Sequence, residues 1–205
     1  MDALILETFS DLDELHQALK AAKTLTDLPV IAQLTFQHRA VTETGVDVYT
    51  ALQGLADAGA DVVGTNCGRG VSNVASVVED FAAQSHAMLS AFPNAGFPEY
   101  VGGRVMYLAS PEYMASMAER MVDAGANIVG GCCGTGPREI AAIAGRLANR
   151  RPVRRVIRPI PRAAPAEPAI LPPKYETFID RAPEKNLVFV ELDPPYGLNY
   201  EKILD

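Results

Sequence analysis

The sequence is short of cysteine, of positive charge and of long apolar runs. Its 205 residues include only three cysteines, and two of these, Cys132 and Cys133, are adjacent, while the third is Cys67. Such a set is a poor disulfide framework and favours a reducing compartment, so we expect a cytoplasmic protein. No apolar stretch approaches the roughly 20 residues of a membrane helix. The first residues carry no basic segment of the kind that opens a secretory signal, so no membrane or secretory destination is expected.

Acidic residues outnumber basic ones, and this balance excludes nucleic acid as the main partner. Lys and Arg total 18 against 25 Asp and Glu, which gives a formal net charge of −7. Phosphate binding needs concentrated positive charge, which such a chain lacks. The hydrophobic content of 48% is normal for a globular protein and excludes global disorder.

Short apolar runs alternate with amphipathic segments through the first three quarters of the chain. This alternation predicts an α/β fold, because strands that are apolar on both faces and separated by helices form parallel sheets with right-handed crossovers. Ser10 is the expected N-cap of the first helix. We expect strands over 4–6, 30–34, 61–66, 87–92 and 127–131, and helices over 11–23, 46–58, 71–84, 111–124 and 137–148.

One segment is repeated within the chain. Residues 57–70 (DAGADVVGTNCGRG) align with residues 123–136 (DAGANIVGGCCGTG), and nine of the fourteen positions are identical. Each copy reads as a helix end, a glycine, a strand and a glycine-rich loop that holds cysteine. Similar βα units explain the first half of the match, but they do not explain why Cys67 falls on Cys133.

The character of the chain changes near residue 150. Residues 149–186 hold eight of the fifteen prolines, and several arginines crowd the first part of this stretch. We therefore expect a Pro/Arg-rich linker over 150–186, with the arginines either solvated or forming a docking strip for an acidic partner. Residues 187–192 then read as a strand that ends at Asp193-Pro194-Pro195.

The three cysteines each follow the carboxyl end of a predicted strand, where parallel α/β folds carry their ligand sites. Three thiolates that converge from two strand ends match a zinc site with one open position. Two other interpretations remain open on the residues alone. The thiols are either small buried hydrophobes, or Cys132 and Cys133 form a redox pair.

Four motifs resemble the zinc-dependent homocysteine S-methyltransferase family across about residues 2–149. They are Leu6-Glu7-Thr8-Phe9, Gly64-Thr65-Asn66-Cys67, Pro93-Asn94-Ala95-Gly96 and Gly130-Gly131-Cys132-Cys133-Gly134-Thr135. The resemblance implies methyl transfer to the thiol of homocysteine, giving methionine, with zinc on Cys67, Cys132 and Cys133. It also implies a (β/α)8 TIM barrel whose mouth holds the zinc.

The resemblance assigns substrate-binding roles to three further residues. Glu7 is expected to bind the ammonium group of homocysteine, although a carboxylate that caps the next helix would look alike. Asn66 and Asn94 are expected to hydrogen-bond the amino-acid group or to orient the site, and ordinary turn chemistry is the alternative.

Only five of the eight βα units of such a barrel are present, and the resemblance places them as units four to eight. We therefore expect residues 1–149 to be the C-terminal part of a homocysteine-binding barrel, in a fragment or behind a misplaced start. The missing units, or a partner chain, would be needed to cover the two sheet edges. A truncated, non-catalytic zinc-binding chain and a dithiol redox protein are the alternatives to the methyltransferase.

The last segment resembles a second family. Val190-Glu191-Leu192-Asp193-Pro194-Pro195 is similar to the first strand of methylenetetrahydrofolate reductase, with Glu191 where that family keeps its acid. Residues 187–205 would then begin a second barrel, as in bifunctional proteins that join these two modules. This arrangement favours a folate as methyl donor and implies FAD only for the second module.

Overall fold

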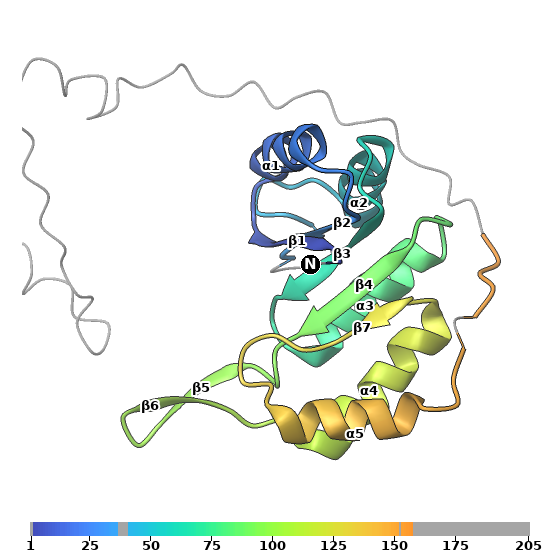
Figure 1. Ribbon diagram of the computed structural model, residues 1–205. Helices are drawn as coiled ribbons and strands as arrows, with labels where there is room; N and C mark the ends of the chain where they lie inside the picture. The colour runs from blue at the N-terminus through green and yellow to red at the C-terminus, as the bar shows by residue number, and fades with distance from the viewer. Residues whose placement is uncertain (1, 37–40, 152, 158–205) are drawn as a thin grey trace, which may run out of the picture. The chain divides into compact units, whose positions relative to one another are not determined.

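The structure is a computed structural model that describes residues 2–36, 41–151 and 153–157 (Figure 1). The chain divides into one compact unit, Met1–Ile160, and a second, Pro161–Asp205, and the description here is of the first. The predicted strand at 187–192, Glu191 and most of the predicted linker lie outside the described residues.

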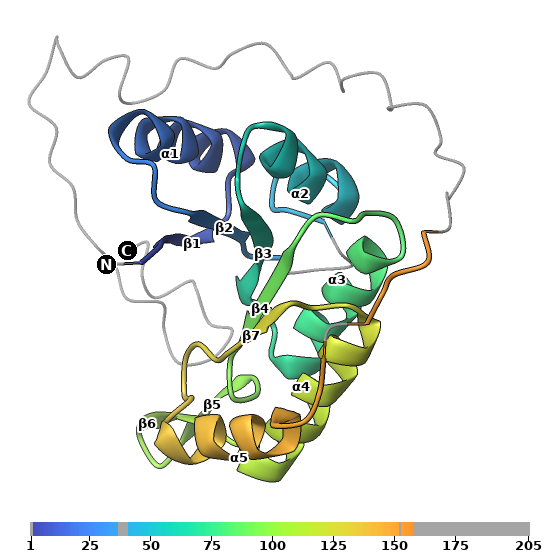
Figure 2. The same ribbon diagram turned by 45° about the vertical axis from the view of Figure 1, so that its right-hand side comes forward.

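Five parallel strands form the main sheet, and their spatial order follows the chain (Figure 2). Each neighbouring pair is parallel, and every predicted strand is present: the second has the predicted bounds and the other four have shifted ends. The fifth strand is shorter than predicted. The strands are β1 (Leu4–Phe9), β2 (Val30–Leu34), β3 (Val62–Cys67), β4 (Leu89–Pro93) and β7 (Ile128–Val129).

Five helices follow these strands; the first four pack on one face of the sheet, and the last packs on the fourth helix (Figures 1 and 2). Their apolar sides pack on alternate strand residues such as Ala32, Leu34 and Val63, which are all fully buried. The first helix is capped by Asp11, whose carboxylate accepts the N–H groups of Asp13 and Glu14, so the prediction of Ser10 as N-cap was wrong. The helices are α1 (Leu12–Leu25), α2 (Val48–Asp57), α3 (Val71–Ala82), α4 (Pro111–Ala124) and α5 (Pro137–Leu147).

The opposite face of the sheet carries a buried polar row. Gln33, Gly64 and Ser90 are register neighbours on β2, β3 and β4. The Gln33 amide crosses the central strand and donates to Ser90 Oγ at 2.9 Å. A Cβ atom at position 64 would lie 2.2 Å from both Ser90 oxygens, so only glycine fits in the middle of this row.

The connection between β4 and α4, for which no strand was predicted, forms a hairpin. Its strands are β5 (Pro98–Val101) and β6 (Arg104–Tyr107), and it projects from the body of the described unit (Figure 1). Gly102 and Gly103 both have positive φ, at 57° and 82°, as a two-residue hairpin turn with inverted backbone requires. This Gly-Gly pair was the sequence signal for the hairpin.

The sheet is open on both sides within the part of the chain that the structure describes. The outermost strands there are β1 and β7, the first and last strands of the series, in agreement with the two open edges expected of five units from a larger barrel. Among the described helices, none has the length and apolar character needed to cross a membrane.

The described part of the arginine run is solvated only in part: Arg151 and Arg154 are exposed, as expected, whereas two other arginines make specific contacts. Arg150 pairs with Asp123 and Glu119 on α4. Arg155 is half-buried and donates to the carbonyls of Ser85, Ala87 and Gly125 and to the side chain of Asn127.

Candidate metal centre

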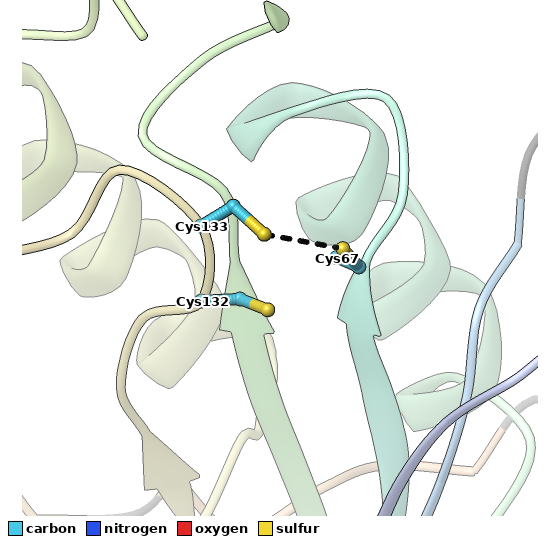
Figure 3. A group of neighbouring side chains, drawn as sticks. All are labelled: Cys67, Cys132 and Cys133. Carbon is cyan, nitrogen blue, oxygen red and sulfur yellow. Dashed lines mark hydrogen bonds between the residues drawn. The ribbon is translucent and has the colours of Figure 1, made fainter.

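Three thiols converge where β3 and β7 reach their carboxyl ends. Cys67 is the last residue of β3, and Cys132 and Cys133 lie in the loop between β7 and α5. Their sulfur atoms point toward a common space (Figure 3), and all three lie within 4.8 Å of one another. Cys67 Sγ and Cys133 Sγ are 3.9 Å apart. The structure thus brings together all three predicted ligands.

The cysteine loop is held in place by an extension of β4. The N–H of Cys132 donates to the carbonyl of Pro93, and the carbonyl of Cys133 accepts the N–H of Ala95. Asn94 completes the arrangement, because its Oδ1 accepts the N–H of Cys133 at 3.1 Å and its Nδ2 donates to the carbonyl of Gly68. The amide of Asn94 therefore joins the two loops that carry the thiols.

Gly134, the residue after Cys133, allows a close approach of the β5–β6 hairpin to the thiols. A Cβ at Gly134 would lie 2.4 Å from the Cβ and Cγ of Tyr107, and its φ is 74°. Both observations require glycine at this position. The phenol of Tyr107 accordingly interacts with the Cys133 side chain, and this hydrogen bonding is the main cause that raises the pKa of Tyr107.

The separation of two of the thiols, Cys67 and Cys133, fits sulfur ligands on one tetrahedral zinc ion. Sulfur ligands at ~2.3 Å around one tetrahedral zinc lie about 3.8 Å apart, which matches the separation of Cys67 and Cys133. None of the three side chains is fully buried, so a fourth ligand could reach the centre from solvent. A three-sulfur site of this kind leaves one position for water or substrate, as catalytic zinc sites do.

The thiols also affect one another. Burial is the main cause that raises the pKa of Cys67, to about 12, and the charge of Cys132 acts in the same direction. Without a cation the surroundings of Cys67 therefore oppose its ionisation, whereas a divalent metal would favour the thiolate form of this side chain.

Glu7 and Asn66 lie beside the thiols, on the strands β1 and β3. The Asn66 amide donates to Glu7 Oε2 at 3.3 Å and to Cys132 Sγ at 3.7 Å. Asn66 is fully buried, whereas Glu7 is exposed and free to meet a ligand. All six residues predicted for the first module's site thus gather at one edge of the sheet.

Two residues near the site were not predicted from the sequence. Thr8 has φ 64° and forms both backbone and side-chain hydrogen bonds with Asn66, and Tyr107 interacts with Cys133. Only a structure reveals them, because left-handed threonine has no sequence signature and Tyr107 belongs to the hairpin that was missed.

Known proteins share sequence similarity with this chain. Residues 1–147 match the sequence profile described as homocysteine S-methyltransferase. The chain is 31% identical over 162 residues to a methionine synthase of Mycobacterium tuberculosis and 29% identical over 154 residues to one of Mycobacterium leprae. These matches cover 76% and 72% of this chain but only 14% and 13% of the mycobacterial proteins.

Solved structures show the same fold. Those of the homocysteine methyltransferase MmuM from Escherichia coli, in apo and metallated forms, match with TM-scores of 0.57 and 0.58 at 21% and 20% identity. Each match covers 71% of this chain and 49% or 45% of the MmuM chain, so the chain spans about half of that protein. Because the homocysteine S-methyltransferase profile matches residues 1–147, the chain belongs to the homocysteine S-methyltransferase family.

Proposed function

We propose that this chain carries the metal and homocysteine site of a zinc-dependent methyltransferase that converts homocysteine to methionine. The observation that carries the proposal is the convergence of Cys67, Cys132 and Cys133 within 4.8 Å at the carboxyl edge of the sheet. The metallated form of the related MmuM fold supports a bound metal, and family membership together with the three-sulfur ligand set supports zinc as the ion.

The three cysteines would hold the zinc and leave one position for the sulfur of homocysteine. Bound zinc supplies Lewis acidity, which favours the thiolate form of a coordinated thiol. In the overall reaction the thiol loses its proton, its sulfur forms a bond to the methyl carbon, and the bond from that carbon to the donor breaks. The bonding electrons of the broken bond stay with the donor.

Other residues of the chain would orient the substrate. Glu7 is exposed beside the thiols, and its carboxylate is the expected partner of the homocysteine ammonium. Asn94 joins the Cys67 loop to the Cys133 loop, so it would fix the spacing of the ligands and lie within reach of the amino-acid group.

The setting of the site within a larger protein also belongs to the proposal. We assign the five described βα units to positions four to eight of a (β/α)8 barrel, completed by further units or by a partner chain. The resemblance of residues 190–195 to methylenetetrahydrofolate reductase supports a second module with Glu191 as its acid and FAD as its cofactor. That module favours a folate methyl donor, and the cysteine content favours a cytoplasmic location.

Calorimetric titration with L-homocysteine before and after zinc loading tests the proposal. We expect one zinc per chain, homocysteine binding only to the zinc form, and release of a proton on binding. Glu7→Gln should weaken homocysteine binding about tenfold, because a charged hydrogen bond is lost, and should spare the zinc. Asp13→Asn, at another exposed acid, is the matched control and should change neither.

Two outcomes would contradict the proposal. Homocysteine binding without zinc would remove the metal from the site's function. A reversible Cys132–Cys133 disulfide, with Cys132→Ser abolishing thiol exchange and leaving metal content unchanged, would instead support the dithiol redox protein.

A further inference from the structure

Asn66 is a fully buried amide whose hydrogen-bonding groups are all used inside the protein. Its Oδ1 accepts the backbone N–H of Thr8 at 2.9 Å. Its Nδ2 lies within hydrogen-bonding distance of three acceptors: Thr8 Oγ1 at 2.7 Å, Glu7 Oε2 at 3.3 Å and Cys132 Sγ at 3.7 Å. The side chain of Asn66 on β3 thus contacts both Glu7, the residue predicted to bind the substrate, and Cys132, a predicted metal ligand.

The contacts with Thr8 coincide with a break in the β1 ladder. Register between β1 and β2 shifts by one residue between Leu6 and Phe9, so Thr8 lies in a bulge. Its φ of 64° is in the left-handed region, which β-branched residues disfavour. Asn66 accepts the N–H of Thr8 and also donates to its hydroxyl, so the amide satisfies both groups of the displaced residue.

The bulge determines where Glu7 points, because an extra residue in a strand redirects the neighbouring side chains. We propose that Asn66 is a positioning residue: by holding Thr8 in its left-handed conformation it places the Glu7 carboxylate at a fixed distance from Cys132. This inference rests on the proposed function, in which Glu7 binds the ammonium of homocysteine while its sulfur lies at the thiol cluster. Asn66 itself then touches neither zinc nor substrate.

Only an amide serves all of these contacts. Aspartate at position 66 would keep the acceptor for the Thr8 N–H but lose the donor for Glu7 and Cys132, and it would add a negative charge beside both. Alanine would remove the acceptor and the donor. Glycine at position 8 adopts positive φ without strain, so it should lessen the need for Asn66 to hold the bulge.

The test uses the full chain with Asn66→Ala, Asn66→Asp and Asn66→Ala combined with Thr8→Gly. Gln33→Met is the matched control, since Gln33 is also a fully buried amide on the same face but bonds Ser90 instead. Three quantities are measured: hydrogen exchange of the Thr8 amide, zinc per chain, and KM and kcat for homocysteine. The exchange rate needs neither zinc nor substrate.

We expect Asn66→Ala to raise the hydrogen-exchange rate of the Thr8 amide. The homocysteine KM should rise about tenfold, because a misplaced Glu7 carboxylate loses its charged hydrogen bond with the substrate. Zinc content and kcat should change little. Asn66→Asp should keep the protection of the Thr8 amide yet raise KM. Adding Thr8→Gly to Asn66→Ala should lower KM again, whereas Gln33→Met should leave KM and Thr8 exchange as in the parent chain.

Unchanged Thr8 exchange and KM in Asn66→Ala would overturn the inference. So would the same KM rise in Gln33→Met, because the effect would then be general loss of packing, or the absence of any rescue by Thr8→Gly. If Asn66→Ala does not fold, Asn66→Asp decides, and an unaltered KM in that variant rejects the positioning role. Failure of the parent chain to bind homocysteine would reject the proposed function separately, because the exchange measurement at Thr8 is independent of it.

Discussion

Asp61 and Asn127 hold equivalent positions in the repeated segments and make the same contact. The Asp61 carboxylate accepts the N–H of Val30, the first residue of β2, at 2.7 Å, and Asn127 Oδ1 accepts the N–H of Leu89, the first residue of β4, at 2.9 Å. Each therefore ties the start of its own strand to the start of the neighbouring strand. A basic side chain completes each pair, Lys23 on Asp61 and Arg155 on Asn127.

Asp61→Asn introduces the residue type that Asn127 has at the equivalent position of the second repeated segment. The variant should keep the hydrogen bond with the N–H of Val30 and lose only the ion pair with Lys23. The hydrogen bond with Lys23 is the main cause that lowers the pKa of Asp61 below its usual value. A lowered pKa stabilises the folded chain above the unfolded value of about 3.9, and this contribution is lost as the pH falls through the folded pKa. We expect the free energy of unfolding of the variant at pH 7 to fall by less than about 1 kcal/mol. The difference should vanish in acid, as measured by urea unfolding across pH. A constant difference at all pH values would exclude the ionic origin.

Gly64→Ala should destabilise the fold strongly. Its Cβ would meet Ser90 O and Oγ at 2.2 Å in the buried polar row, and backbone cannot move aside cheaply. Overpacking of this kind costs about 3 kcal/mol. Gly54→Ala in α2 is the control, because its nearest neighbours lie 3.8 Å away, and it should stabilise the helix by up to about 1 kcal/mol. Equal effects of the two variants would refute the account of the polar row.

Arg155→Ala should loosen the attachment of residues 153–157 to the α/β body of the described chain. Its guanidinium donates to three backbone carbonyls and to Asn127, and these acceptors would be left without their partner. We expect the free energy of unfolding, measured by chemical denaturation, to fall by about 3 kcal/mol in this variant, and by a smaller amount in Arg155→Lys. Arg154→Ala, at the exposed neighbour, should be nearly neutral, and a similar loss there would mean that general charge rather than the bonds is responsible.

The open edge at β1 should make the isolated chain self-associate. Among the described strands β1 has a neighbour on one side only, and its Ile5 is 48% exposed; an open apolar edge of this kind invites pairing with another chain. Ile5→Lys should therefore lower the association seen by sedimentation velocity. Leu25→Lys makes the same charge change at the end of α1, away from the edge, and should have little effect. A monodisperse parent chain would contradict this prediction.

Much of the fold followed from hydrophobic pattern. The five strands and five helices were predicted from apolar runs and helical spacing, because burial on one or both faces leaves a clear period in the sequence. The β5–β6 hairpin was missed although Gly102-Gly103 signals it. Its strands are short and exposed, so they show little of the hydrophobic pattern that marks the core.

The candidate site was predictable in its residues but not in its internal bonds. Glycine-flanked cysteines after two strands indicated convergence, and the structure brings them within 4.8 Å. The left-handed conformation of Thr8 is stabilised by hydrogen bonds with Asn66, a residue 58 positions away in the sequence. Local sequence carries no record of such a contact. The burial of Arg155 was equally hidden, because its neighbours in the arginine run have the same chemistry but different surroundings.

X-ray absorption at the zinc edge tests the central claim most directly, since it counts sulfur atoms on the metal. We expect the zinc-loaded chain to show three sulfur ligands at ~2.3 Å and one lighter ligand, and four sulfurs after homocysteine is added. Alanine at Cys67, Cys132 or Cys133 should each remove one sulfur or the metal altogether. A zinc ion with fewer than three sulfurs in the parent chain, or a sulfur count that homocysteine leaves unchanged, would contradict the account.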